Sequence, residues 1–187
     1  MIARSEEKIE NGGELPESLQ LGLAVGDAVV YPVHGVGRVV AREQSVVGGS
    51  ERDCIVLELP AGLRVTLPLD VAAARLRGVV DEVELEKVQR TLAAESSGRD
   101  GPWTRRIKES RAKLTSGRVT DLAELVRDGG RCGWPETGSS LSPGERRVYL
   151  QARQLLAREI SCARGMETGE ADAWIEAQIA LPVESGG

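Results

Sequence analysis

The sequence predicts an α+β protein in which a small β-barrel precedes an all-helical domain. Between residues 23 and 80, short apolar runs are separated by Gly and Pro, which is typical of strands joined by tight turns. Beyond residue 80 the apolar residues recur every three or four positions, which is typical of amphipathic helices. We therefore divide the chain into a flexible N-terminal tail at 1–22, the barrel at 23–80 and the helical domain at 81–187.

Four apolar runs define the barrel strands, at 28–31, 37–41, 54–59 and 64–67. Gly35 and Gly37 predict a tight turn ahead of the second strand, because glycine readily adopts positive φ angles. Gly48 and Gly49 separate the second strand from the third, and the Pro-Ala-Gly segment at 60–62 predicts a reversal before the fourth. Four or five strands this short and this closely spaced predict a small, strongly bent β-barrel.

Helices are predicted at 81–94, 102–116, 119–127, 143–164 and 168–180, with a linker at 95–102 and a loop at 129–140. Asp81 is placed to cap the first helix, and Gly117 follows directly after the second. Ser142 and Glu145 flank Pro143 and form a capping box at the start of the longest helix. These end signals predict where each helix begins and ends.

Charge is distributed unevenly along the chain. The whole sequence carries a net charge of −5, but residues 103–164 contain 13 basic and 7 acidic side chains. The basic residues are densest in the second predicted helix and the turn after it: Arg105, Arg106, Lys108, Arg111, Lys113 and Arg118. Such a cluster attracts polyphosphate even though the chain as a whole is acidic. The alternative is that these side chains only line a solvated helix face.

Trp103 opens the same helix, two residues ahead of a pair of arginines. An aromatic wedge beside phosphate-binding cations suits an unstacked or distorted minor groove. The indole could instead anchor the helix in the core, where it would be buried. The two roles therefore predict opposite exposures for Trp103.

Other functional classes leave no pattern in the sequence. Cys54, Cys132 and Cys162 form no CxxC pair and His34 is the only histidine, so we expect neither a metal site nor a disulfide scaffold. No nucleotide-binding or nucleophile motif is present, so we expect no enzyme activity, no catalytic residue and no cofactor. We expect a cytoplasmic protein, because the sequence contains neither a signal peptide nor an apolar run long enough to cross a membrane.

Four segments carry a family resemblance. They are VGDAVVYPVHGVGRVV at 25–40, WTRRIKESRAKL at 103–114, AELVRD at 123–128 and LSPGERRVYLQARQLLAREI at 141–160. In order and approximate spacing they resemble the CarD/CdnL family of bacterial transcription regulators that bind RNA polymerase. The first segment also resembles transcription-repair coupling factors, but those proteins continue into a helicase for which this chain has no room.

The resemblance implies a Tudor-like barrel that docks on the β subunit of RNA polymerase and a helical domain that contacts promoter DNA. It implies a regulator that stabilises the open promoter complex with a tryptophan in the minor groove at the upstream edge of the bubble, without reading the DNA sequence. The DNA-binding residues that it implies are Trp103, Arg105, Arg106, Lys108, Arg111 and Lys113. The polymerase-binding residues that we expect on this basis are Arg42, Arg64, Thr66 and Pro68. We expect a monomer.

Two alternatives stay open. Ser45 and Thr66 stand approximately where family members often have arginines, and the loop that contains Trp134 replaces a helical continuation, which would fit a divergent paralogue with altered polymerase or promoter preference. The chain could also be a protein-only adaptor, whose barrel binds a partner by strand addition and whose basic helix is held in ion pairs. Binding to DNA that weakens as salt increases would distinguish a regulator from an adaptor.

Overall fold

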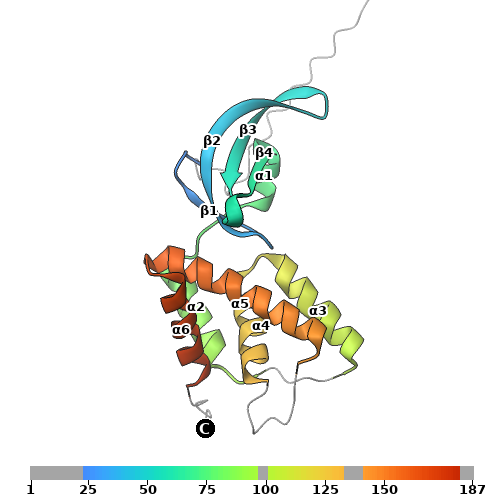
Figure 1. Ribbon diagram of the computed structural model, residues 1–187, viewed down its shortest axis with the longest axis vertical. Coiled ribbons are helices and arrows are strands. Elements are labelled where there is room, and N and C mark those ends of the chain that lie inside the picture. The colour runs from blue at the N-terminus through green and yellow to red at the C-terminus, as the bar shows by residue number, and fades with distance from the viewer. Residues whose placement is uncertain (1–22, 97–100, 133–140, 182–187) are drawn as a thin grey trace, which may run out of the picture.

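The computed structural model describes residues 23–96, 101–132 and 141–181, which form a bent antiparallel sheet stacked on a bundle of helices (Figure 1). Each part has its own hydrophobic core. The core of the sheet is formed by Val29, Val39, Ile55, Leu57, Leu67 and Ala72. The second core lies among the helices and contains Leu85, Val126, Leu156, Ile160 and Ile175, all nearly inaccessible to solvent. The predicted α+β class with a helical C-terminal part is confirmed.

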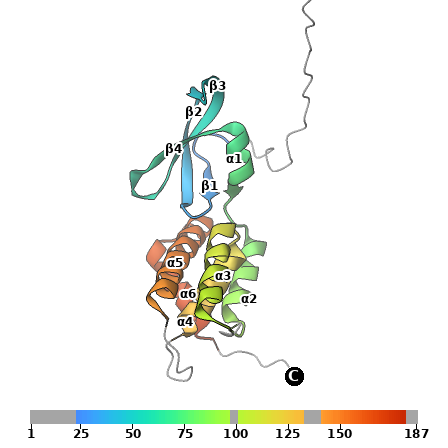
Figure 2. The same ribbon diagram turned by 90° about the vertical axis from the view of Figure 1, so that its right-hand side faces the viewer.

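The sheet has five strands in the order β4-β3-β2-β1-β5, with antiparallel pairing throughout. The strands are β1 (Ala28–Tyr31), β2 (Gly35–Val47), β3 (Ser50–Glu58), β4 (Arg64–Pro68) and β5 (Arg77–Gly78). β2 and β3 form a long hairpin around Gly48 and Gly49, the pair predicted to separate these strands, and both glycines adopt positive φ angles. A short helix that the sequence analysis did not predict, α1 (Leu69–Arg75), packs beside β3 and β4 (Figure 2).

The turn between β1 and β2 differs from the prediction. β2 already begins at Gly35, so the turn lies at 32–34 and Val33 adopts a positive φ of 70°. Gly37 lies inside the strand, where a Cβ atom would come within 2.7 Å of the Leu59 side chain. Close packing, rather than turn geometry, therefore requires glycine at position 37.

Five helices form the second part: α2 (Glu82–Ala93), α3 (Trp103–Ser116), α4 (Val119–Arg131), α5 (Pro143–Arg164) and α6 (Thr168–Ile179). The predicted end signals are confirmed for three of them. Asp81 caps α2, Gly117 ends α3 in the left-handed conformation, and Ser142 and Glu145 form both hydrogen bonds of the capping box of α5.

The prediction of a loop at 129–140 is wrong for its first three residues, because α4 continues to Arg131. Gly129 faces Tyr149 of α5, and a Cβ atom there would lie 2.3 Å from the tyrosine ring. Glycine at this position allows the two helices to approach closely, which offsets its low helix propensity. Residues 133–140, including Trp134, lie outside the described residues.

Candidate nucleic-acid interface

Helix α3 turns one face to the bundle and the other to solvent. Ile107 and Leu114 are buried against the other helices. The opposite face is exposed and contains Thr104, Arg105, Lys108, Arg111, Ala112 and Thr115. The helical period thus separates the apolar residues of this segment from several of its cations.

Trp103 lies at the N-terminal end of α3 with 48% of its surface exposed. Its indole Nε1 donates a hydrogen bond to the Ser142 hydroxyl oxygen, at 2.8 Å. The ring therefore lies at the surface and in a defined orientation. This exposure favours a surface role for Trp103 over the alternative of a core anchor.

The hydroxyl that holds the indole belongs to a wider network. Ser142 accepts a hydrogen bond from the Glu145 amide and donates one to the Glu145 carboxylate at 2.7 Å. Arg106 donates to the same carboxylate at 3.1 Å, and Glu145 is only 8% exposed. The network thus ties the N-terminal ends of α3 and α5 together and supports the indole between them.

Several of the cations predicted to contact DNA are engaged within the protein. Arg105 pairs with Glu109 one turn along the helix, and the hydrogen bond and charge of that carboxylate raise the pKa of Arg105. Lys113 pairs with Glu124 of α4 at 2.6 Å, and Arg106 pairs with the buried Glu145. Arg106 in particular is half-buried, so its main contacts are with the protein.

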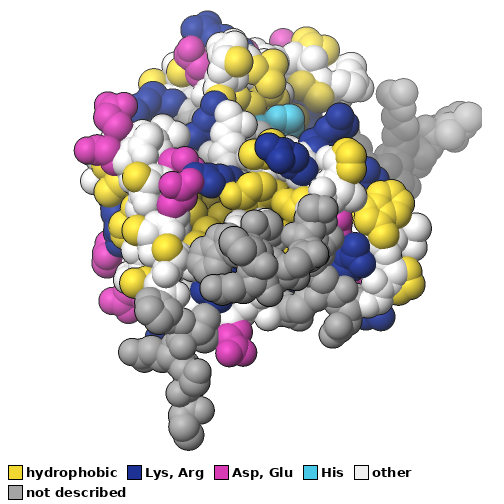
Figure 3. All heavy atoms as spheres, turned by 60° about the horizontal axis from the view of Figure 1, so that its bottom comes forward, with side chains coloured by type: hydrophobic (Ala, Val, Ile, Leu, Met, Phe, Trp, Pro, Cys, Tyr) yellow, Lys and Arg dark blue, Asp and Glu magenta, His cyan; other side chains and the backbone are white. Residues whose placement is uncertain are grey.

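Lys108 and Arg111 differ from these cations in their surroundings. Both are exposed, and neither pairs with a carboxylate among the described residues. Two further exposed arginines of this kind, Arg146 and Arg147, follow the N-terminal end of α5, where Ser142 contacts Trp103. The sequence analysis missed these two as candidates because they lie about 40 positions along the chain from Trp103. A view from the helical end shows basic side chains gathered on one side of the molecule, whereas the opposite side carries acidic and basic side chains together (Figure 3).

The predicted polymerase-binding residues do not share one face of the sheet. Thr66 pairs with Val56, whereas Arg42 pairs with Ile55, the next residue of β3. Because neighbouring residues of a strand point to opposite faces, Arg42 and Thr66 point to opposite faces of the sheet. Arg64 lies on the face of Thr66, is exposed, and pairs with Glu58 at 3.5 Å.

Pro68, the fourth residue of this prediction, is buried beside Cys54 at the end of β4. Arg64 and Thr66 are therefore the two predicted residues that share an exposed surface. They lie on β4, which is an edge strand of the sheet.

Neither a metal-binding cluster nor a membrane-spanning helix is found in residues 23–96, 101–132 and 141–181. These residues contain no group of three or more His, Cys, Asp or Glu side chains that could hold a metal ion. None of their helices is long and apolar enough to cross a membrane.

Comparison with known proteins shows matches to two family models and similarity to a curated relative. The model of the family described as "CarD-like/TRCF RID domain" matches residues 23–80, and that of "CarD, C-terminal domain" matches residues 87–176. The candidate transcription factor YdeB of Bacillus subtilis strain 168 is 26% identical over 144 residues, which cover 76% of this chain and 92% of YdeB. The two matches follow one another along the chain in the order of the sheet and the helical bundle.

Proposed function

Because this chain belongs to the CarD family of bacterial transcription regulators, whose members associate with RNA polymerase, we propose that it stabilises the open promoter complex by placing Trp103 at the upstream edge of the bubble. One observation carries this proposal: the Trp103 indole is exposed, is oriented by Ser142, and lies at the start of a helix whose Lys108 and Arg111 face no carboxylate in the described parts of the chain. The family consists of regulators, which agrees with the expectation that the chain has no enzyme activity.

The proposed wedge acts through a difference in free energy between closed and open DNA. Unstacking a base step costs a few kcal/mol, and stacking of an indole on the exposed base returns about 1–3 kcal/mol. The closed duplex offers no exposed base, so this gain exists only after opening. The wedge therefore slows collapse of the bubble more than it strengthens initial binding.

Phosphate contacts hold the wedge against the DNA in this proposal. Lys108 and Arg111 supply them from α3, and Arg146 and Arg147 extend the basic surface along α5. Contacts of this kind carry no sequence information, so they position the protein on any promoter. Promoter preference then arises from the energy needed to open each bubble.

The sheet provides the attachment to the polymerase. We assign the docking surface to β4, where Arg64 and Thr66 are exposed on one face of an edge strand. An edge strand can add a strand from a partner through its free backbone groups, and side chains on its exposed face select that partner. The proposed partner is the β subunit of RNA polymerase, bound by one copy of the chain.

The test is the lifetime of the open complex formed by purified RNA polymerase on a promoter. Trp103→Ala should shorten this lifetime, by about tenfold for each 1.4 kcal/mol of stacking that is lost. Trp103→Phe keeps an aromatic face and should retain part of the effect. Circular dichroism of both variants shows whether the helices stay folded. An unchanged lifetime with the alanine variant fully folded would exclude the wedge.

The adaptor without DNA contact is the second candidate. It is favoured by the ion pairs that occupy Arg105, Arg106 and Lys113, which leave fewer cations for phosphate. An adaptor would bind duplex DNA with negligible affinity at low salt. The proposed regulator would bind weakly, and log affinity would fall linearly with log salt concentration.

A further inference from the structure

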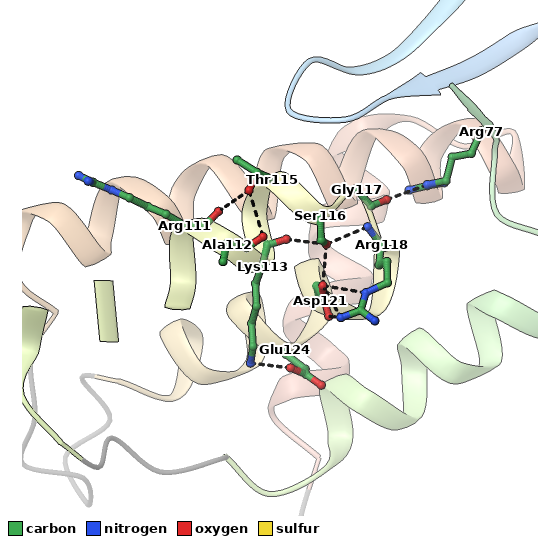
Figure 4. A network of polar contacts seen from close by, with 10 residues as sticks. All are labelled: Arg77, Arg111, Ala112, Lys113, Thr115, Ser116, Gly117, Arg118, Asp121 and Glu124. Atoms are coloured by element: carbon green, nitrogen blue, oxygen red, sulfur yellow. Dashed lines mark hydrogen bonds and ion pairs between the residues drawn. The ribbon is translucent and has the colours of Figure 1, made fainter. Parts of the chain in front are cut away.

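Arg77 joins the sheet to the helical bundle. It belongs to β5, the last strand, and both terminal nitrogens of its guanidinium group hydrogen-bond to Glu159 of α5. Glu159 is 2% exposed, so its carboxylate depends on this partner. The Nε atom of Arg77 donates to the carbonyl oxygen of Gly117 at 2.8 Å (Figure 4). One side chain thus contacts a buried acid of α5 and the C-terminal end of α3.

Gly117 allows the two parts to meet. It ends α3 with a φ of 75°, and a Cβ atom there would lie 2.6 Å from Pro32 in the turn between β1 and β2. Gly35, which follows this turn as the first residue of β2, lies close to α5, since the Leu155 side chain is 3.1 Å from the position that a Cβ atom would take there. Only a residue without a side chain can end α3 so close to the turn.

The turn itself holds an uncommon conformation. Val33 adopts a φ of 70°, and β-branched residues are rarely found there, because their side chains crowd the backbone. A strained residue persists where the surrounding structure determines its conformation. Here the flanking residues Pro32 and Gly35 both contact the helical bundle, so the contact between the two parts maintains the strained turn.

The end of α3 is also tied to α4. The Ser116 hydroxyl lies 2.6 Å from a carboxylate oxygen of Asp121, and Arg118 donates to the same carboxylate through two nitrogens (Figure 4). Movement of α3 relative to the sheet would therefore move the helical bundle with it. The Arg77 and Gly117 contacts therefore link the sheet to the bundle as a whole, beside the contacts between α5 and β2.

Small rotations at this contact produce large movements at Trp103. Trp103 and Gly117 lie at opposite ends of α3, about 21 Å apart at 1.5 Å per residue. A rotation of about 10° at Gly117 would move the indole by roughly 4 Å, which exceeds the spacing of about 3.4 Å between stacked bases. The wedge can match one base step only if the contact between the domains is rigid.

We propose that Arg77 and Gly117 are positioning residues, which direct Trp103 to its base step by fixing the helical bundle on the docked sheet. This inference rests on the proposed function, because it concerns how polymerase docking at β4 aims the wedge. Neither residue would contact the DNA or the polymerase. Their substitution would misplace an intact wedge.

Two variants test the contact. Arg77→Lys keeps a positive charge opposite Glu159, but a single ammonium group cannot reproduce the paired contacts with Glu159 together with the one to Gly117. Gly117→Ala introduces the Cβ atom that would collide with Pro32. The matched control is Arg153→Lys, because Arg153 pairs with Asp172 and Glu176 entirely within the helical bundle.

The first readout is the distance distribution between spin labels on the free full-length chain. The labels are attached to Val46→Cys on the exposed β2–β3 hairpin and to the exposed Cys162 of α5, in a Cys132→Ser background. Both positioning variants should broaden or shift the distribution by several ångströms, and the control should leave it narrow. A distribution that neither variant changes would overturn the inference without reference to polymerase.

The second readout is open-complex lifetime. Both positioning variants should shorten it about tenfold or more, with polymerase association and low-salt DNA binding unchanged within about twofold. If the distribution broadens but the lifetime matches that of the unmodified chain, while Trp103→Ala shortens it, the positioning inference is wrong and the proposed function stands. If Trp103→Ala leaves the lifetime unchanged, the proposed function fails, and positioning of a wedge fails with it. An equal loss of lifetime with Arg153→Lys would indicate general destabilisation and contradict the inference.

Discussion

Arginines and lysines on one helix differ in function according to what faces them. Arg106 and Lys113 point towards carboxylates of neighbouring helices, whereas Lys108 and Arg111 point to solvent. The first pair stabilises the packing of α3, and the second pair is available to phosphate. The number of basic residues in the sequence does not distinguish these two groups.

Substitution of single cations should separate the two groups. Lys108→Ala or Arg111→Ala should reduce the slope of log DNA affinity against log salt by about one unit, because each phosphate contact releases about one counterion. Stability should change by less than about 0.5 kcal/mol, as expected for exposed residues.

Arg106→Ala should lower stability and leave the salt slope of DNA binding nearly unchanged. It leaves the buried Glu145 without its guanidinium partner, which should lower the free energy of unfolding by about 1–3 kcal/mol. Urea denaturation measures this loss. A salt slope that changes equally in all three variants would contradict the division into two groups.

Ser142 combines a structural role with orientation of the indole. Ser142→Ala removes the cap of α5, at a cost of about 1 kcal/mol, together with the acceptor for the Trp103 indole. Open-complex lifetime should therefore fall, though less than in Trp103→Ala. Ser142→Thr retains a hydroxyl group and should preserve most of the stability and lifetime. If alanine and threonine variants have the same lifetime, the hydrogen bond to the indole has no role in the wedge.

At the scale of elements, the approach of α4 to α5 depends on the absence of a side chain. Gly129 lies in the helix against Tyr149, although glycine is among the poorest helix formers. Packing between helices therefore decides the extent of α4. The position of α3 also depends on α4, because Lys113 of α3 pairs with Glu124 of α4.

Two glycine substitutions should change stability in opposite directions. Gly129→Ala should destabilise the protein by about 1–3 kcal/mol, because overpacking against Tyr149 outweighs the better helix propensity of alanine. Gly169→Ala in α6 has no atom within 4 Å of the new Cβ and should stabilise by up to about 1 kcal/mol. Thermal denaturation of both variants measures the difference. If Gly129→Ala instead stabilises the protein, α4 and α5 can move apart without loss of stability, and the prediction of overpacking against Tyr149 is wrong.

At the scale of the molecule, the proposed docking surface and the proposed DNA surface belong to different parts of the chain. β4 is an edge of the sheet, and the cations of α3 and α5 lie on the helical bundle (Figures 1 and 3). The chain has a net charge of −5, which would keep the affinity of the proposed DNA surface for free DNA low. Binding to the polymerase would raise the local concentration of promoter DNA at the basic surface.

Substitutions in one proposed surface should impair the binding activity of that surface and leave the other activity intact. Replacement of Arg64 and Thr66 together by alanine should weaken association with polymerase core and leave low-salt DNA binding unchanged. Replacement of Lys108 and Arg111 together should have the reverse effect. Pull-down with polymerase core and titration with duplex DNA measure the two activities. Loss of both activities in either double variant would show that the surfaces are not separate.

Much of the fold follows from interactions that span only a few residues. The cap of α5 joins Ser142 to Glu145, three positions apart, and the end of α3 depends on the left-handed conformation of Gly117. Interactions of this kind join residues that are close together in the sequence, so the α+β class and most helix ends could be predicted. The exposed position of Trp103 at a helix end was one of two alternatives that the sequence allowed.

The remaining features depend on partners far away in the chain. Arg106 meets Glu145 across 39 positions and Arg77 meets Glu159 across 82, and no local pattern indicates either pair. The extent of α4 depends on Tyr149, and the β1–β2 turn is built on Val33 because of contacts with the helices. The sequence by itself determined the class of fold, the helix ends and the basic segment. Only the tertiary structure decided which cations face no carboxylate among the described residues and how α3 is held against the sheet, because the free energy of a charge or a close contact depends on what packs against it.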